Sequence, residues 1–185
     1  MHYLPRKNRR KLVKTDADQF DTVKVMRGMI IDSALNDNFV HSLINNLRLD
    51  RDLNGLVKVA ELFYVNSSFE PDGPDLQTVR SPRRILKDKK GNCVDFSTAM
   101  GSFGVAMNLP TALVICSTDK DYPDNYNHVF AVINGIPFDL VINQDHVNST
   151  YRTPPRFKQM NFRRMVGINA PYYAKITYPI NYTTT

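Results

Sequence analysis

Cysteines are scarce in this 185-residue chain, and long apolar runs are absent from it. Cys93 and Cys116 are too few for a disulfide framework, so we expect two free thiols in a reducing, cytoplasmic compartment. No stretch approaches the roughly 20 apolar residues of a membrane-spanning helix, so no membrane partner is expected. The N-terminal sequence MHYLPRKNRRKLVK is basic but lacks the apolar core of a secretory signal.

The spacing typical of a metal site is also missing. The chain has no C-x-x-C and no H-x-x-x-H motif, and its four histidines are scattered. A structural zinc site needs four ligands that fold together, so we expect neither a metal nor a cofactor. The histidines are His2, His41, His128 and His146.

Acidic residues are missing from both ends of the chain. Residues 1–14 and residues 146–185 each hold six Lys or Arg and no acid, which leaves 12 basic and all 18 acidic residues in between. We therefore predict a basic arm (1–14), a domain (15–145), and a basic, aromatic-rich extension (146–185) that packs on the domain or extends from it. Basic ends are typical of contact with nucleic acid or an acidic protein surface, although they also serve solubility alone.

Apolar periodicity predicts helices in the first part of the domain. Asn-Asp-Asn at 36–38 is expected to separate the first two helices, with Asp37 or Asn38 as a cap. A third helix is expected from about Gly55. The apolar positions are Phe20, Val23, Met26 and Ile30, then Val40, Leu43, Ile44 and Leu47, then Leu56, Val59, Ala60 and Phe63.

The stretch NSSFEPDGPDLQTVRSP, residues 66–82, is predicted to be a loop because it is dense in Pro, Gly, Asp and Ser. A connection of this length is more often functional than idle.

A helix is then expected from Cys93 to about Met107. Asn92 is a good N-cap, and Asp95 falls at the third helical position, which approximates a capping box. Cys93 begins an apolar stripe, and two glycines on the adjacent face would let a strand or helix approach closely. The stripe continues with Phe96, Met100, Phe103 and Met107, and the glycines are Gly101 and Gly104.

Three strands are expected after this helix. Residues 111–117 read as a buried strand, and residues 128–142 as a hairpin around Asn134-Gly135, the favoured two-residue type I′ turn. The last stretch, APYYAKITYPINY, is compatible with an edge strand, the place in a sheet where Pro179 is tolerated.

The turn fixes the register of the hairpin. If Ile133 faces Ile136, His128 lies opposite Val141, and Asp139 shares the sheet face of His128 as its diagonal neighbour. Such neighbours lie about 7–8 Å apart at the backbone, within reach of a His–Asp hydrogen bond.

These positions suggest thiol chemistry if the helix packs on that sheet face, because Cys93, His128 and Asp139 then converge. A helix N-terminus and a neighbouring imidazolium favour the thiolate. Asp139 would orient the ring of His128, and the backbone N–H of Cys93 is a ready oxyanion donor.

Each signal alone also fits a structural role. A cysteine on an apolar stripe is most often a core residue, which is what we expect of Cys116 inside its strand. His146, just past the hairpin, is a reserve candidate for the base. Serine catalysis is not expected, because Ser97 and Ser102 lie mid-helix and no G-x-S-x-G motif occurs.

Over about residues 60–142 the chain resembles the transglutaminase-like superfamily of papain-fold thiol enzymes. The pattern of that family is Gly-Asp-Cys at a helix start with an acid two residues later. A helix ending in Gly-Ile-Pro, a strand, a strand opening His-Val and a strand carrying Asp follow. Here Asn92 replaces the first Asp and Asn-Leu-Pro replaces Gly-Ile-Pro, while LQTVRSPRRIL is similar to the lead-in of bacterial and phage members. The matching positions are Gly91, Cys93, Asp95, His128, Val129 and Asp139.

The resemblance implies an α+β fold in which a central helix packs on an antiparallel sheet with extra N-terminal helices. It implies Cys93 as nucleophile, His128 as base and Asp139 as the orienting residue. The implied enzyme is a cofactor-free cysteine peptidase, amide hydrolase or acyltransferase that acts on a protein or peptide through a thioester. Candidates for a second oxyanion donor or a substrate contact are Asn92, Gln77, Asn66 and Tyr64.

Some members of that family lack the triad and are structural modules. The alternative is therefore a structural or virion-associated protein whose basic ends contact nucleic acid or sister subunits. A phage-encoded protein of either kind would reside in the host cytoplasm or the virion.

Overall fold

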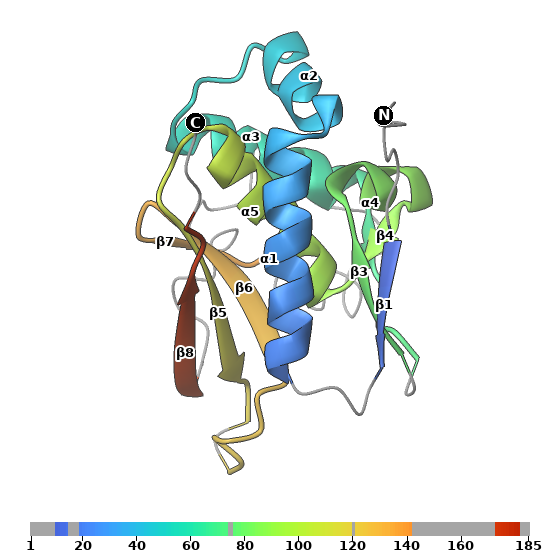
Figure 1. Cartoon of the computed structure of the whole chain (residues 1–185), viewed down its shortest axis with the longest axis vertical. Helices are drawn as coiled ribbons and strands as arrows, with labels where there is room; N and C mark the ends of the chain where they lie inside the picture. The colour runs from blue at the N-terminus through green and yellow to red at the C-terminus, as the bar shows by residue number, and fades with distance from the viewer. Residues whose placement is uncertain (1–9, 15–18, 74–75, 120, 142–172, 182–185) are drawn as a thin grey trace, which may run out of the picture.

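The computed structural model describes residues 10–14, 19–73, 76–119, 121–141 and 173–181 (Figure 1). Its helices are α1 (Gln19–Leu35), α2 (Asn38–Asn46), α3 (Leu53–Asn66), α4 (Pro82–Asp88) and α5 (Cys93–Ala106). Its strands are β1 (Arg10–Lys14), β2 (Ser68–Phe69), β3 (Leu76–Arg80), β4 (Lys90–Gly91), β5 (Thr111–Ser117), β6 (His128–Ile133), β7 (Ile136–Phe138) and β8 (Tyr173–Pro179).

Several helices begin where the sequence supplies a side-chain cap, because a cap satisfies an N–H that has no partner within the helix. Asp37 caps α2, as predicted, by accepting a 2.9 Å hydrogen bond from the N–H two residues ahead. Asp52 caps α3 through the N–H of Gly55 at 3.0 Å, so this helix begins two residues before the predicted start. Ser81 caps α4, and Pro82 occupies its first turn.

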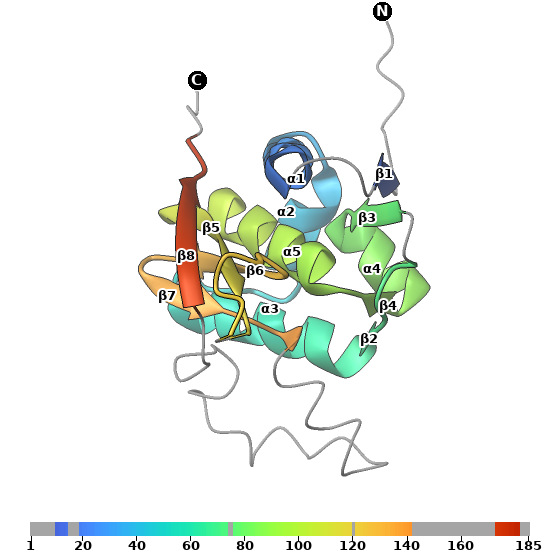
Figure 2. The ribbon, with the colours of Figure 1, turned by 90° about the horizontal axis from the view of Figure 1, so that it is seen from below.

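The central helix of the fold is α5. It contacts α1, α2, α3 and α4 as well as strands β3, β4, β5 and β6. Figure 2 shows α1 on one side of it and α3 on the other. Cys93 is half-buried, and every other residue of α5 is buried. The predicted α+β class, with a central helix packed on an antiparallel sheet and extra N-terminal helices, is confirmed.

Two glycines let α5 lie close to its neighbours, as predicted. A Cβ atom built on Gly101 would lie 2.7 Å from Cδ1 of Ile30 in α1. One built on Gly104 would lie 2.6 Å from Oγ1 of Thr111 and 3.0 Å from Cγ2 of Ile133 in the sheet. A helix therefore approaches at the first glycine and two strands approach at the second.

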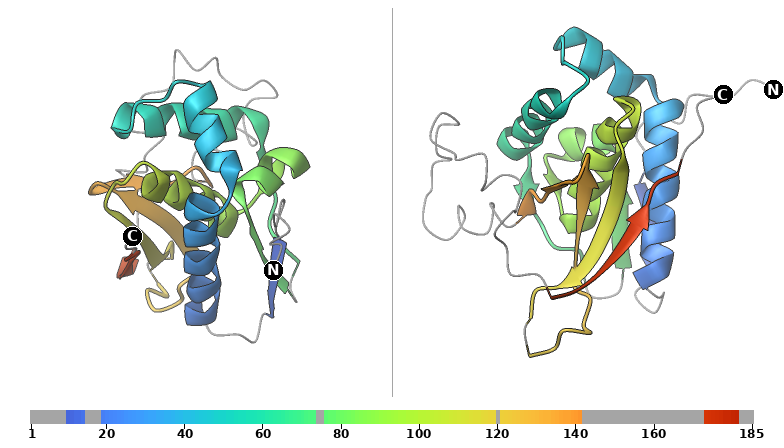
Figure 3. Two further views of the ribbon diagram at one scale, coloured as in Figure 1. Left: turned by 45° about the horizontal axis from the view of Figure 1, so that its top comes forward. Right: turned by 90° about the vertical axis from the view of Figure 1, so that its left-hand side faces the viewer.

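The main sheet is antiparallel with the strand order β7-β6-β5-β8 (Figure 3). Ile133 pairs with Ile136 across the turn, so the register predicted from Asn134-Gly135 is confirmed. β7 is short and ends at Phe138. β8 lies at the other edge with Pro179 opposite Ala112, which agrees with the predicted edge strand.

The prediction of a loop over residues 66–82 is wrong in part. β2 pairs in parallel with β4, and β3 pairs in antiparallel with β1 from the N-terminal arm. The partners lie about 20 and about 65 residues away in the sequence. The local Pro and Gly residues predicted a loop correctly only for the short turn around Pro71 and Gly73.

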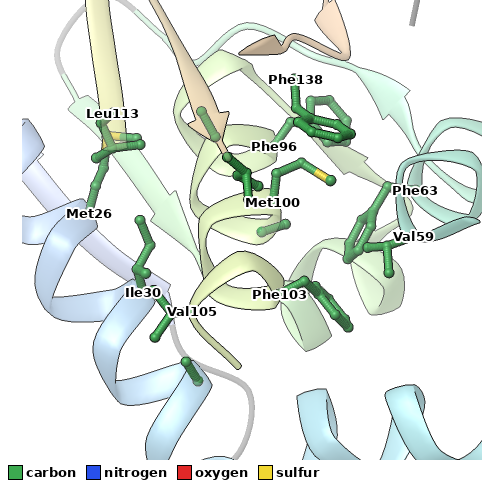
Figure 4. Packing of buried hydrophobic residues seen from close by; sticks show 14 of the residues in the cluster. Met26, Ile30, Val59, Phe63, Phe96, Met100, Phe103, Val105, Leu113 and Phe138 are labelled. Atoms are coloured by element: carbon green, nitrogen blue, oxygen red, sulfur yellow. The ribbon is translucent and has the colours of Figure 1, made fainter. Parts of the chain in front are cut away.

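Apolar side chains from all layers fill the core around α5 (Figure 4). A smaller buried cluster of Val114, Cys116 and Phe130 lies on the other face of the sheet. Phe20 departs from the predicted helical stripe: it is 51% exposed, and its ring packs edge-on against Tyr178. It occupies the first turn of α1, beyond the reach of the main core. None of the helices in the described part of the chain has the length and apolar character needed to cross a bilayer.

Candidate active site

The start of α5 is built by a capping box. The Asn92 side chain accepts a hydrogen bond from the N–H of Asp95 at 3.1 Å, and the Asp95 carboxylate accepts one from the N–H of Asn92 at 3.1 Å. This reciprocal pair explains why the helix begins at Cys93. Cys93, the residue after Asn92, therefore lies in the first turn of α5, and its side chain is half-buried.

His128 and Asp139 come together through the hairpin. Nε2 of His128 lies 2.5 Å from Oδ2 of Asp139, and the other carboxylate oxygen accepts a 3.0 Å hydrogen bond from the N–H of Val141. Both side chains are buried, with Asp139 only 2% exposed. The register brings the chain to this point, because Ala131 pairs with Phe138, and Asp139 lies one residue beyond the end of β7.

The sheet face that α5 covers is not the face that carries His128, so the condition under which the sequence suggested convergence is not met. α5 packs on the face of Val129, Ala131 and Ile133, whereas the alternation of the strand places His128 on the face of Phe130. Residues on a strand point alternately to the two faces, and the sequence did not show which face the helix would choose.

Cys93 and His128 meet at an edge of the sheet instead. Because β7 ends at Phe138, no described strand continues the sheet on that side of residues 128–130. The first turns of α5 lie along this open edge, where Oγ of Ser97 is 2.6 Å from the carbonyl oxygen of Cys93 and 3.0 Å from that of Val129. One hydroxyl thus bridges the residue of the thiol and the strand of the imidazole.

The side chains of Cys93 and His128 are hydrogen-bonded. Since Nε2 faces Asp139, the remaining ring nitrogen, Nδ1, is the one available to the sulfur. Burial by itself lowers the pKa of His128, but the hydrogen bonds and negative charges of Asp139 and Cys93 outweigh it and raise the pKa to about 10. The ring is therefore an imidazolium at neutral pH and can donate to the carboxylate and the sulfur together.

Cys116 is a core residue, as predicted. It is fully buried and pairs directly opposite His128 across the sheet. Burial, followed by the negative charge of Asp139, raises the pKa of the Cys116 thiol to about 12. A thiol that is both buried and protonated at neutral pH does not act as a nucleophile.

Two of the candidate oxyanion donors, Gln77 and Asn92, share one acceptor, Asp72. The N–H of Cys93 is at the helix start, and no acceptor for it occurs among the residues that the structure describes. Nε2 of Gln77 donates to Asp72 and to the carbonyl of Thr78, and Nδ2 of Asn92 donates to Asp72.

The two other candidates lie on α3. Nδ2 of Asn66 donates to the carbonyl of Leu62 and is exposed. Tyr64 is buried, and burial raises the pKa of its hydroxyl.

Histidines other than His128 contribute nothing to this site that the structure describes. Nε2 of His41 lies 2.7 Å from the carbonyl oxygen of Ala34 and joins α2 to α1. His2 and His146 fall outside the described residues, as do most of the basic ends, so the predicted partners of those ends stay predictions. Among the described side chains, no group of three or more His, Cys, Asp or Glu is arranged to hold a metal ion.

Two residues beside the site were missed at the level of the sequence. Arg80 is buried and pairs with the Asp95 carboxylate, to which its backbone N–H also donates at 2.7 Å. Asp72 accepts the hydrogen bond from Asn92 at 2.8 Å. Both belong to the segment that local turn signals described as a loop. The one sign in the sequence that charged partners lie beside the helix start was the number of charged residues in the segment just ahead of the capping box.

Comparison with known proteins assigns no family. No family model matches the chain, and no curated protein does. A solved structure from Cytophaga hutchinsonii, described as a candidate cysteine protease, aligns with a TM-score of 0.38 and 12% sequence identity. The alignment covers 95% of this chain and 65% of that one, so the chain spans slightly less than two thirds of the other protein. A likeness at this level carries no argument about function.

Proposed function

We propose that the chain is a cofactor-independent thiol hydrolase or acyltransferase that acts on an amide bond of a protein or peptide. The observation that carries this proposal is the placement of His128 between the Asp139 carboxylate and the Cys93 thiol. A nucleophile hydrogen-bonded to a base that a third group orients is the arrangement that covalent catalysis requires.

In the proposed reaction, Cys93 is the nucleophile. Its sulfur attacks the amide carbonyl carbon while the imidazolium of His128 holds a proton ready. The carbonyl oxygen becomes an oxyanion, to which the N–H of Cys93 is placed to donate a hydrogen bond. When the tetrahedral intermediate collapses, the C–N bond breaks, His128 gives its proton to the leaving amine, and a thioester remains on the sulfur.

The second half of the reaction releases the acyl group. The now neutral His128 takes a proton from water or from an acceptor amine, which attacks the thioester carbonyl. Collapse breaks the C–S bond, returns the thiolate of Cys93 beside the imidazolium, and releases an acid or a new amide. Asp139 keeps the ring oriented and stabilises its charged form in both halves.

The test compares the two thiols of the chain under native conditions. We expect iodoacetamide to alkylate Cys93 at neutral pH far faster than Cys116, as followed by mass spectrometry of the digested protein. An amide-based electrophilic probe should label the wild type but not Cys93→Ala, with His128→Ala giving slow labelling. Equal, slow reaction of both thiols in the folded protein would overturn the proposal and favour a structural role for the scaffold.

A further inference from the structure

The start of α5 is held by a segment that lies well before it in the chain. β2 pairs Ser68 with Lys90 and Phe69 with Gly91, directly ahead of the cap. The pairing continues beyond the strand, because the N–H of Glu70 donates to the carbonyl of Gly91 at 2.9 Å. Residues 68–70 therefore hold the two residues that precede Asn92.

Asp72 restrains the N-cap residue, Asn92, directly. Its Oδ2 accepts hydrogen bonds from Nδ2 of Asn92 at 2.8 Å, from Nε2 of Gln77 at 2.8 Å and from the N–H of Thr78 at 2.5 Å. Its Oδ1 accepts a hydrogen bond from Oγ1 of Thr78 at 2.5 Å. A carboxylate with four donors around it is fixed in position, and it in turn fixes the amide of Asn92.

Asn92 is thereby restrained through each of its polar groups. Its Nδ2 donates to Asp72, its Oδ1 accepts from the N–H of Asp95, and its own N–H donates to the Asp95 carboxylate. Asp95 is anchored to Arg80 through both the guanidinium and the backbone N–H. The residue that follows Asn92 is Cys93, so these contacts set where its sulfur and its N–H lie.

We infer that Asp72 is a positioning residue, which acts through Asn92 to fix the sulfur of Cys93 against the ring of His128. The inference rests on the proposed function, in which that contact is the reacting pair. Asp72 has no hydrogen bond to either residue of the pair, so its influence passes through the cap. Small displacements of a reacting group reduce rates steeply, by about 100-fold for about 1 Å.

Asp88 offers a matched control, because it belongs with Asp72 to the cluster of charged side chains around Arg80. Its side chain is 15% exposed and that of Asp72 is 12% exposed, and the two carboxylates lie 3.8 Å and 3.7 Å from the guanidinium nitrogens of Arg80. Asp88 also pairs with Arg84 at 2.6 Å but has no hydrogen bond to the cap of α5. Removing its carboxylate therefore changes the charge of the cluster and leaves Asn92 in place.

The experiment measures the rate constant for alkylation of Cys93 by iodoacetamide, which needs no knowledge of the substrate. We expect Asp72→Ala to slow alkylation about tenfold or more, because Asn92 loses its anchor. Asp88→Ala should stay near the wild-type rate. Asp72→Asn should restore most of the rate, since its amide oxygen can accept from Asn92 while its NH2 donates to the hydroxyl of Thr78.

A double-mutant cycle tests the route through Asn92. Asn92→Asp keeps a good N-cap but replaces the donor to Asp72 by an acceptor. We expect this variant to slow alkylation, and we expect Asp72→Ala to have no further slowing effect in its background. If Asp72→Ala fails to fold, the slow alkylation expected of Asn92→Asp still tests the contact.

The outcomes separate this inference from the proposed function. Wild-type Cys93 that reacts no faster than Cys116 would overturn the proposed function. If wild-type Cys93 reacts fast, and folded Asp72→Ala or Asn92→Asp matches that rate, the positioning role is overturned and the function stands. Equal slowing by Asp72→Ala with and without Asn92→Asp would overturn the route through the cap. A merely structural role would lower the melting temperature without changing the rate constant of the folded protein.

Discussion

Replacing Asp139 by Asn should lower the pKa of the His128 imidazole by about two pH units or more. Burial alone lowers that pKa, and the raised value of about 10 depends on the negative charges and hydrogen bonds of Asp139 and Cys93. An opposite charge within hydrogen-bond distance shifts a pKa by about one to three pH units. The substitution removes the charge and leaves an amide of the same shape.

The contribution of His128 to stability follows from the difference between its raised pKa and the ordinary value for histidine. A rise from 6.5 to about 10 corresponds to a preference of about 5 kcal/mol for the charged ring in the folded protein. Because the pKa is raised on folding, this stabilisation is complete below pH 6.5 and is lost as the pH rises through about 10. The free energy of unfolding of the wild type should therefore fall across that window, and that of Asp139→Asn should fall much less.

The assay is an NMR titration of the histidine Cε1–H resonances, with His128→Gln to identify the resonance of interest. In the wild type this resonance should show no deprotonation between pH 5 and 8, whereas in Asp139→Asn the midpoint of its titration should fall at about pH 8 or below. Asp121→Asn, in an exposed loop, serves as the control for loss of one negative charge. A His128 resonance that titrates near pH 6.5 in the wild type, or is unmoved by Asp139→Asn, would refute the reasoning.

Three further experiments test the packing around the site. In urea unfolding, Gly104→Ala should destabilise the fold by about 1–3 kcal/mol, because its Cβ would lie 2.6 Å from a strand hydroxyl. Gly28→Ala, whose Cβ would have nothing within 4 Å, should stabilise the fold by about 0.5–1 kcal/mol. The opposite ranking of the two variants would contradict the distance between helix and sheet. Ser97→Ala should lower the free energy of unfolding by about 1 kcal/mol and slow alkylation of Cys93, since its hydroxyl joins α5 to β6. Ser102→Ala, whose hydroxyl bonds only within α5, should leave that alkylation rate unchanged. Cys116 should resist iodoacetamide up to about pH 9 in the native protein and react once urea unfolds it, and rapid native labelling would show that it is not a core residue.

The local chemistry of the chain was predictable because it depends on neighbours in the sequence. The capping box of Asn92 and Asp95 involves residues three apart, and the register of the hairpin depends on Asn134-Gly135. That register brings Asp139, one residue past the end of β7, close to His128. Each of these features is fixed by backbone geometry over a few residues, so the wider fold had little influence on it.

Features that depend on distant partners were not predictable in the same way. β2 and β3 form because they pair with β4 and β1, and the sequence of residues 66–82 does not indicate those partners. The exposure of Phe20 depends on where the core ends. The face of the sheet that α5 covers depends on how the remaining helices pack around it.

By itself, the sequence determined a thiol at a capped helix start and a His–Asp pair on one hairpin, because short-range geometry governs both. Only the tertiary structure decided that they meet, and that they do so at the open edge of β6 beside Cys93. It also decided that Asp72 and Arg80 hold the cap, since contacts between residues 20 and 15 positions apart form only when the core packs.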